Sequence, residues 1–267
     1  MPFSHLESEE HFFSHKVDHC LVMIFNRPEK YNAFTLEMYH QLAKAYYQIE
    51  SDPEIRCGLL IARGKNFTAG LELEKWIGSF STGKPEPLPE DEIDPFGITG
   101  KKLSKPIIMA TQGICFTVGL ELMLNTDIRL CTPDCRFAQL EVKRGIYPCG
   151  GATIRLPKEI GWTNAQRYLM TGEEFNGEDA YRMGLVQQLE PLENLHQAAF
   201  DIAQRVCKVA PLAVQVSLKS SKLAHYESQQ KAFDTLYEPM ATITKSEDAK
   251  EGVQSFLERR EAVFKGK

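Results

Sequence analysis

Two glutamates, Glu121 and Glu141, have the residue type for proton transfer, and each stands beside a glycine-containing turn that could open a helix. They lie 20 positions apart in the chain (141 − 121). Two carboxyl groups that share one proton can serve as base and acid in the same reaction. The competing interpretation is a pair of solvated charges at helix starts, where glutamate is favoured electrostatically. The flanking turns favour the catalytic interpretation.

Small residues follow two predicted strands, at points where backbone N–H groups can reach a ligand. The segment 67–70 follows the apolar run 59–62, and Val118 precedes the apolar-periodic segment that contains Glu121. Free N–H groups at a helix N-terminus stabilise a developing oxyanion, an effect that reaches ~3–4 kcal/mol per donor. We therefore predict that the N–H groups of Ala69 and Val118 are oxyanion donors.

Apolar runs at 20–25, 58–62 and 106–111 predict three buried strands. Between the first two, apolar residues from Met38 to Ile49 recur at spacings of 4, 3 and 4, which predicts a helix that Asp52 and Pro53 end. A strand, a helix and a strand predict a right-handed crossover unit. Ligands of such α/β sheets bind at the carboxyl ends of the strands.

The segment 80–103 is rich in proline, glycine and acidic residues, and it predicts an irregular loop. It is either a lid over a pocket or a solvated surface insertion. From about residue 195 the apolar residues recur at helical spacing to near the C-terminus.

Composition narrows the classes of function. The net charge of −5 gives no electrostatic reason to expect binding to nucleic acid. The seven cysteines are an odd number, mostly in apolar runs, and no Cys-x-x-Cys pair occurs, so we expect free thiols and no metal site. The acidic N-terminus and the lack of a membrane-spanning apolar run predict a cytoplasmic protein.

Five ordered motifs resemble the crotonase superfamily, the enoyl-CoA hydratase/isomerase family. They are Phe25-Asn26-Arg27-Pro28 with Asn32-Ala33, the segments 67–70 and 113–121, the segment 137–151, and the segment 180–186. The resemblance implies an α/β fold in which a spiral of ββα turns forms a core over 1–194. It also implies a C-terminal helical region over 195–267 that carries trimer contacts.

The resemblance further implies that the chain adds water across the 2,3 double bond of a 2-enoyl-CoA. Ala69 and Val118 match the family's oxyanion donors, Glu121 would activate water, and Glu141 would donate a proton to C2. No cofactor is implied, because coenzyme A is part of the substrate, and the assembly would be a homotrimer or homohexamer. The residues expected to contact the substrate are Arg27, Lys30, Ala33, Ala69, Gly70, Leu71, Glu72, Phe256 and Lys265.

Three departures from the family pattern leave alternatives open. Val118 replaces a usual glycine, Leu71-Glu72 replaces the usual Ala-Asp, and Cys149 replaces another glycine. The alternatives are an enoyl-CoA isomerase, an acyl-CoA hydrolase, and a non-catalytic acyl-CoA-binding protein in which Val118 blocks the productive pose.

Overall fold

The computed structural model describes residues 3, 6 and 8–267, with the side chain of Ile77 left out. A six-stranded sheet forms its centre, in the spatial order β1-β2-β3-β4-β6-β9. β1 pairs antiparallel with β2, and the other pairs in this sheet are parallel. The bounds are β1 (Phe12–Val17), β2 (Cys20–Phe25), β3 (Cys57–Ala62), β4 (Ile107–Thr111), β6 (Ile128–Cys131) and β9 (Gln188–Leu189).

A smaller, three-stranded sheet has the order β5-β7-β8. Its strands are β5 (Ile114–Phe116), β7 (Arg136–Ala138) and β8 (Phe175–Asn176). The chain passes from β4 directly into β5 and then into α3 (Val118–Met123), and it passes from β6 into β7 in the same way. Successive ββα turns therefore carry the chain from one sheet to the other.

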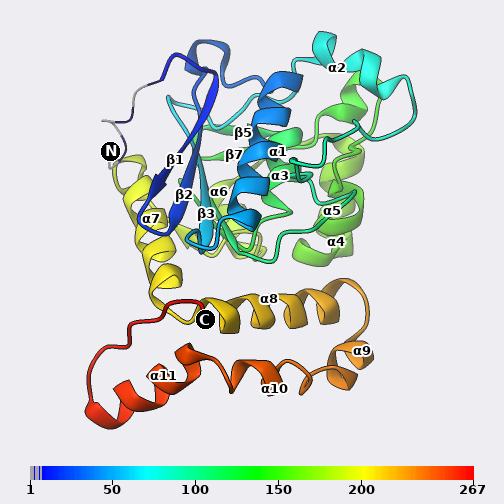
Figure 1. Cartoon of the computed structure of the whole chain (residues 1–267). Helices are drawn as coiled ribbons and strands as arrows, with labels where there is room; N and C mark the ends of the chain where they lie inside the picture. The colour runs from blue at the N-terminus through cyan, green and yellow to red at the C-terminus, as the bar shows by residue number, and fades with distance from the viewer. Residues whose placement is uncertain (1–2, 4–5, 7) are drawn as a thin grey trace.

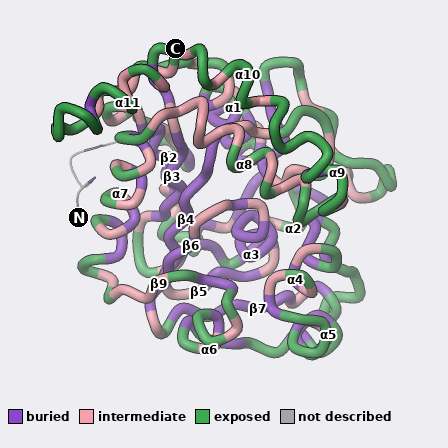
Figure 2. Tube along the Cα trace, turned by 90° about the horizontal axis from the view of Figure 1, so that it is seen from below, coloured by how far each residue is buried: buried purple, intermediate pink, exposed green. Residues whose placement is uncertain are grey.

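Helices cover both faces of the larger sheet, which is why β2, β3 and β4 are buried along their whole length. α1 (Leu36–Ser51) packs with alternate residues of β2 in one hydrophobic cluster. α7 (Leu192–Lys208) packs with the intervening residues of β2 in a second cluster. Figure 2 shows β2, β3, β4 and α3 in the buried centre of the molecule.

Shorter helices connect the strands. They are η1 (Pro28–Lys30), α2 (Leu73–Phe80), η2 (Glu141–Arg144), α4 (Ala152–Ile160), α5 (Trp162–Thr171) and α6 (Gly177–Arg182).

The last four helices form a C-terminal arm, α8 (Pro211–Tyr226), α9 (Gln229–Asp234), α10 (Met240–Ile243) and α11 (Glu247–Glu258). Figure 1 shows α10 and α11 on the side of α8 that faces away from the sheets. A salt bridge of 2.8 Å from Lys222 in α8 to Asp127 ties the arm to the core. The predicted division at residue 195 falls within α7, which packs on the sheet.

The predicted strands at 20–25, 58–62 and 106–111 and the predicted helix between the first two are confirmed. The parallel pairing of β2 with β3 across α1 confirms the crossover unit. Within the segment 80–103, residues 81–103 have no regular helix or strand. This segment nevertheless packs on α1, because Ile93 is buried and its N–H donates to the Ala43 carbonyl at 3.0 Å.

The turn between β4 and β5 requires glycine at position 113. Gly113 has a φ of +61°, and a Cβ there would overlap the carbonyl oxygen of Lys65. Gly100 has nearly the same φ, +60°, and open space around it. We expect Gly113→Ala to lower the free energy of unfolding by roughly 1–3 kcal/mol more than Gly100→Ala, because only the first adds a steric clash to the backbone strain. Chemical denaturation of the two variants measures this difference, and equal losses would contradict the account of this turn.

Candidate active site

Two chain segments, 66–71 and 112–118, run side by side and in parallel at the edge of the two sheets. Thr68 and Cys115 form a parallel bridge. The Thr68 N–H donates to the Ile114 carbonyl at 3.0 Å, and the Thr68 carbonyl accepts from the Phe116 N–H at 3.1 Å. Gly119 lets α3 approach this pair closely, since a Cβ there would lie 2.5 Å from Thr68 Cγ2. The last residues of the two segments, Leu71 and Val118, are therefore held at the same end of the pair.

Ala69 is not a free oxyanion donor, contrary to the prediction from sequence. Its N–H donates to the Tyr31 carbonyl at 2.9 Å, on the side away from the segment 112–118. Leu71 has the free group instead. The Gly70 carbonyl and the Glu72 N–H both bond to Phe34, so the alternation of an extended chain turns the Leu71 N–H to the opposite side. In the described part of the chain the Leu71 N–H has no acceptor.

Val118 is the first residue of α3, and its N–H has no acceptor among the described residues. Its side chain is buried in the hydrophobic cluster that includes residues of α1. The positive φ falls on the preceding residue, Thr117. A β-branched residue at φ 49°, ψ −112° carries backbone strain of roughly 1–3 kcal/mol. Because α3 has only six residues, the free N–H matters here more than a helix dipole.

Glu121 lies in α3 with its carboxyl group buried; the residue is only 5% exposed. The Ala152 N–H donates to Oε1 at 3.2 Å. Gly150 lets the carboxyl group lie against the backbone, because a Cβ there would lie 2.5 Å from Oε2 and would displace it. Burial raises the pKa of Glu121 to about 8, and the negative charge of Glu141 adds to the effect.

Glu141 begins η2, directly after the Gln139-Leu140 segment that follows β7, and is 9% exposed. Burial raises the pKa of Glu141 to about 7. Gln139 is buried beside this carboxylate. When its side-chain amide is oriented so that the nitrogen faces Glu141, that nitrogen lies 2.9 Å from each oxygen of the Glu141 carboxylate. Sequence reasoning missed Gln139. The available signal was a polar residue two positions before a candidate acid, at the end of a predicted buried segment.

Cys149 is the exposed cysteine of seven free thiols. Burial of its sulfur raises its pKa, and the charges of Glu121 and Glu141 raise it further. The side chain therefore remains a neutral thiol at neutral pH, which does not favour a role as nucleophile.

Two predicted substrate contacts, Arg27 and Glu72, pair with each other. The Arg27 guanidinium donates to the Glu72 carboxylate and, at 3.2 Å, to the Ala33 carbonyl. Arg27 holds the pKa of Glu72 below its ordinary value. The pair joins the loop after β2 to the start of α2, so its first role is to position that loop. Lys30 is exposed next to it.

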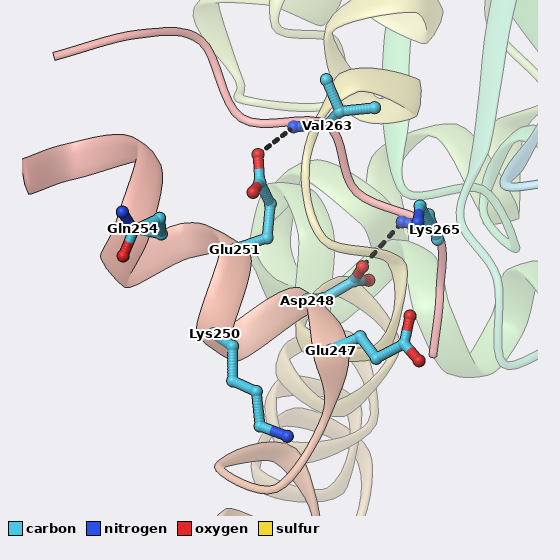
Figure 3. A pocket seen from close by; sticks show the side chains of 7 residues that line it. All are labelled: Glu247, Asp248, Lys250, Glu251, Gln254, Val263 and Lys265. Carbon is cyan, nitrogen blue, oxygen red and sulfur yellow. Dashed lines mark hydrogen bonds between the residues drawn. The ribbon is translucent and has the colours of Figure 1, made fainter. Parts of the chain in front are cut away.

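The two predicted contacts near the C-terminus, Phe256 and Lys265, belong to the arm and are not brought to the glutamates of the same chain. Phe256 is 82% exposed on α11. Lys265 lines a hollow of about 410 Å³ between α11 and the C-terminal tail. Figure 3 shows three carboxylates around this hollow, with backbone N–H groups of the tail bound to Asp248 and Glu251. Lys250 and Lys265 also line the hollow, so its lining carries charges of both signs.

The model of the enoyl-CoA hydratase/isomerase family matches residues 16–267 of the chain. The chain belongs to this family. An enoyl-CoA hydratase of Mycobacterium tuberculosis, EchA19, is 32% identical over 254 residues, which cover 93% of this chain and 94% of the relative. A carnitinyl-CoA dehydratase of Salmonella typhimurium is 30% identical, over 92% of this chain and 95% of the relative.

Solved structures confirm the crotonase-type α/β fold. A probable enoyl-CoA hydratase/isomerase from Mycobacterium abscessus has a TM-score of 0.93 and 40% identity, over 97% of this chain and all of that one. An enoyl-CoA hydratase from Mycobacterium tuberculosis has a TM-score of 0.86 and 28% identity, with the same coverage.

Two further properties concern the described residues only. They contain no group of three or more His, Cys, Asp or Glu side chains that could hold a metal ion. No helix among them has both the length and the apolar character needed to cross a membrane.

Burial of Glu121 predicts how stability depends on pH. Its folded pKa, about 8, lies above the ordinary value of 4.5, so the stability it contributes is full below pH 4.5 and is lost as pH rises through 8. Glu121→Gln removes this loss. We expect the variant to gain on the order of 1 kcal/mol or more relative to wild type between pH 5.5 and pH 8.5. Thermal unfolding at both pH values measures it, and a pH-independent difference would contradict a buried, proton-binding carboxyl.

Proposed function

We propose that the chain is a hydratase that adds water across the 2,3 double bond of a 2-enoyl-CoA thioester. One observation carries the proposal. Glu121 and Glu141 are buried carboxyl groups with raised pKa values, and the charge of Glu141 acts on Glu121. Among the described residues the N–H groups of Leu71 and Val118 have no acceptor, and Val118 opens the helix that carries Glu121. Addition of water to this substrate needs a base, an acid and donors for a developing enolate oxygen.

In this proposal the thioester oxygen accepts from the N–H groups of Leu71 and Val118. Both groups lie at the ends of the paired segments, and we propose that they reach the same oxygen there. As water adds to C3, negative charge moves onto that oxygen, where these donors stabilise it. Leu71 thus replaces Ala69 in the role first expected from the sequence.

Glu121 takes a proton from the attacking water, and Glu141 delivers a proton to C2. The two carboxyls interact, so they titrate as a pair and hold one proton between the two titrations. Their pKa values, about 8 for Glu121 and about 7 for Glu141, are close enough for the shared proton to move to Glu141, as these roles require. Gln139 holds Glu141 by both oxygens, which fixes the direction of its carboxyl group. We expect activity to fall both when the pair gains a second proton and when it loses the shared one.

The proposal includes assembly with further copies of the chain around the acyl-CoA substrate. Exposed apolar side chains on the arm, including Phe233, Tyr237, Phe256 and Leu257, need a covering surface. We propose that a second copy supplies it in a homotrimer or a homohexamer. Phe256 and Lys265 then meet the substrate of a neighbouring subunit, or they serve only assembly.

An isomerase or hydrolase of the same family would use the same oxyanion donors with different proton transfers. Product analysis separates them, since an isomerase moves the double bond without water and a hydrolase releases free coenzyme A. The non-catalytic alternative, in which Val118 blocks the productive pose, would bind acyl-CoA without turnover.

Replacing Glu141 with glutamine tests the assignment. Glu141→Gln removes the proton that the acid delivers, so we expect the rate of crotonyl-CoA hydration to fall by at least about 100-fold. Loss of the conjugated thioester absorbance measures the rate. Glu193→Gln, an exposed position on α7, is the matched control and is expected to retain full activity.

Unchanged hydration in folded Glu141→Gln would contradict its role as acid. Wild-type protein that binds crotonyl-CoA but moves the double bond or releases coenzyme A would replace the hydratase with one of the alternatives.

A further inference from the structure

Thr117 holds an unusual backbone conformation at the start of the candidate oxyanion site. Its N–H donates to the Ala138 carbonyl at 2.8 Å, and its own carbonyl accepts from the Glu121 N–H at 3.0 Å. Strand β7 and helix α3 thus fix both sides of this residue, which keeps it at φ 49°. The direction of its side chain follows from this constraint.

The Thr117 side chain faces Gly70 on the neighbouring segment, with the hydroxyl foremost. A Cβ on Gly70 would meet Oγ1 first, before Thr117 Cβ at 3.6 Å and Cγ2 at 3.8 Å. Both backbone groups of Gly70 already have partners, since its N–H donates to Thr68 Oγ1 and its carbonyl accepts from the Phe34 N–H. In the part of the chain that the structure describes, the Thr117 hydroxyl has no hydrogen-bond partner, and the residue is partly exposed.

This hydroxyl is close in the chain to one free N–H group and faces the residue that precedes the other. Thr117 immediately precedes Val118, and the glycine that it faces immediately precedes Leu71. We infer that the Thr117 hydroxyl is a third hydrogen-bond donor to the thioester oxygen of the acyl-CoA substrate. The inference rests on the proposed function and adds a side-chain donor to its two backbone donors.

The proposal requires that the hydrogen bond from the Thr117 hydroxyl become stronger as negative charge develops on the thioester oxygen. A neutral hydroxyl that faces no protein acceptor needs no reorganisation before it meets an oxyanion, so it contributes to the rate more than to substrate binding. Removing it should therefore lower kcat and leave KM nearly unchanged.

Three substitutions separate the hydroxyl from the backbone strain. Thr117→Val keeps the β-branched shape and removes the hydroxyl, Thr117→Ser keeps the hydroxyl, and Thr117→Gly removes both the hydroxyl and the strain. We expect kcat for crotonyl-CoA to fall roughly 10- to 100-fold in the valine and glycine variants and about 3-fold or less in the serine variant. The glycine variant should also gain roughly 2–4 °C in Tm.

A spectroscopic readout reports the donor directly. Cinnamoyl-CoA bound to the protein should show a red-shifted absorbance, because hydrogen bonds to the thioester oxygen polarise the conjugated system. We expect the shift to be smaller with Thr117→Val than with wild type or Thr117→Ser. A merely structural role for Thr117 would not move this band.

The outcomes distinguish this inference from the proposed function. Wild-type hydration with equal kcat and equal red shift in folded Thr117→Val would overturn the inference and leave the function standing. A wild-type protein that binds enoyl-CoA without hydrating it would overturn the function, while a red shift that depends on the hydroxyl would still support the donor. A wild type that binds no acyl-CoA would overturn both.

Discussion

The parallel pairing of the segments 66–71 and 112–118 is the constraint on which the site depends. Its backbone hydrogen bonds at Thr68 place the ends of two segments next to each other, although they are nearly fifty residues apart in the chain. Glycines at 70, 113 and 119 permit this approach, each because a side chain would collide with the opposite segment or the turn beside it. Helix α3 starts where the second segment ends. Glu121 is therefore at the same end of the paired segments as the N–H groups of Leu71 and Val118, which have no acceptor among the described residues.

The site also concentrates destabilising features. It buries two carboxyl groups, and it holds a threonine at positive φ. Each of these lowers the stability of the folded chain, and each is kept in place by the sheets and helices around it. Burial is at the same time what brings the pKa values of the glutamates close to neutral pH, where one carboxyl can release a proton while the other accepts one.

Much of this arrangement could be predicted from the sequence. The central layers were predicted from the apolar runs of β2, β3 and β4 and from the periodic apolar face of α1, because residue type and spacing indicate which positions are buried. The ordered motifs led to both glutamates. The choice between Ala69 and Leu71 could not be made in this way, since it depends on which side of an extended segment each N–H faces once Phe34 has paired. The strain at Thr117 likewise depends on its hydrogen bond to Ala138 of β7, a contact between distant segments that local sequence does not encode.

The account is tested most directly by a crystal structure of the protein with a bound 3-hydroxyacyl-CoA, the expected product. It predicts that the thioester oxygen lies about 2.7–3.1 Å from the backbone nitrogens of both Leu71 and Val118, with the Glu121 and Glu141 carboxyl groups next to C2 and C3. A thioester bound elsewhere, or one whose oxygen contacts neither nitrogen, would contradict the central claim that the paired segments form the oxyanion site.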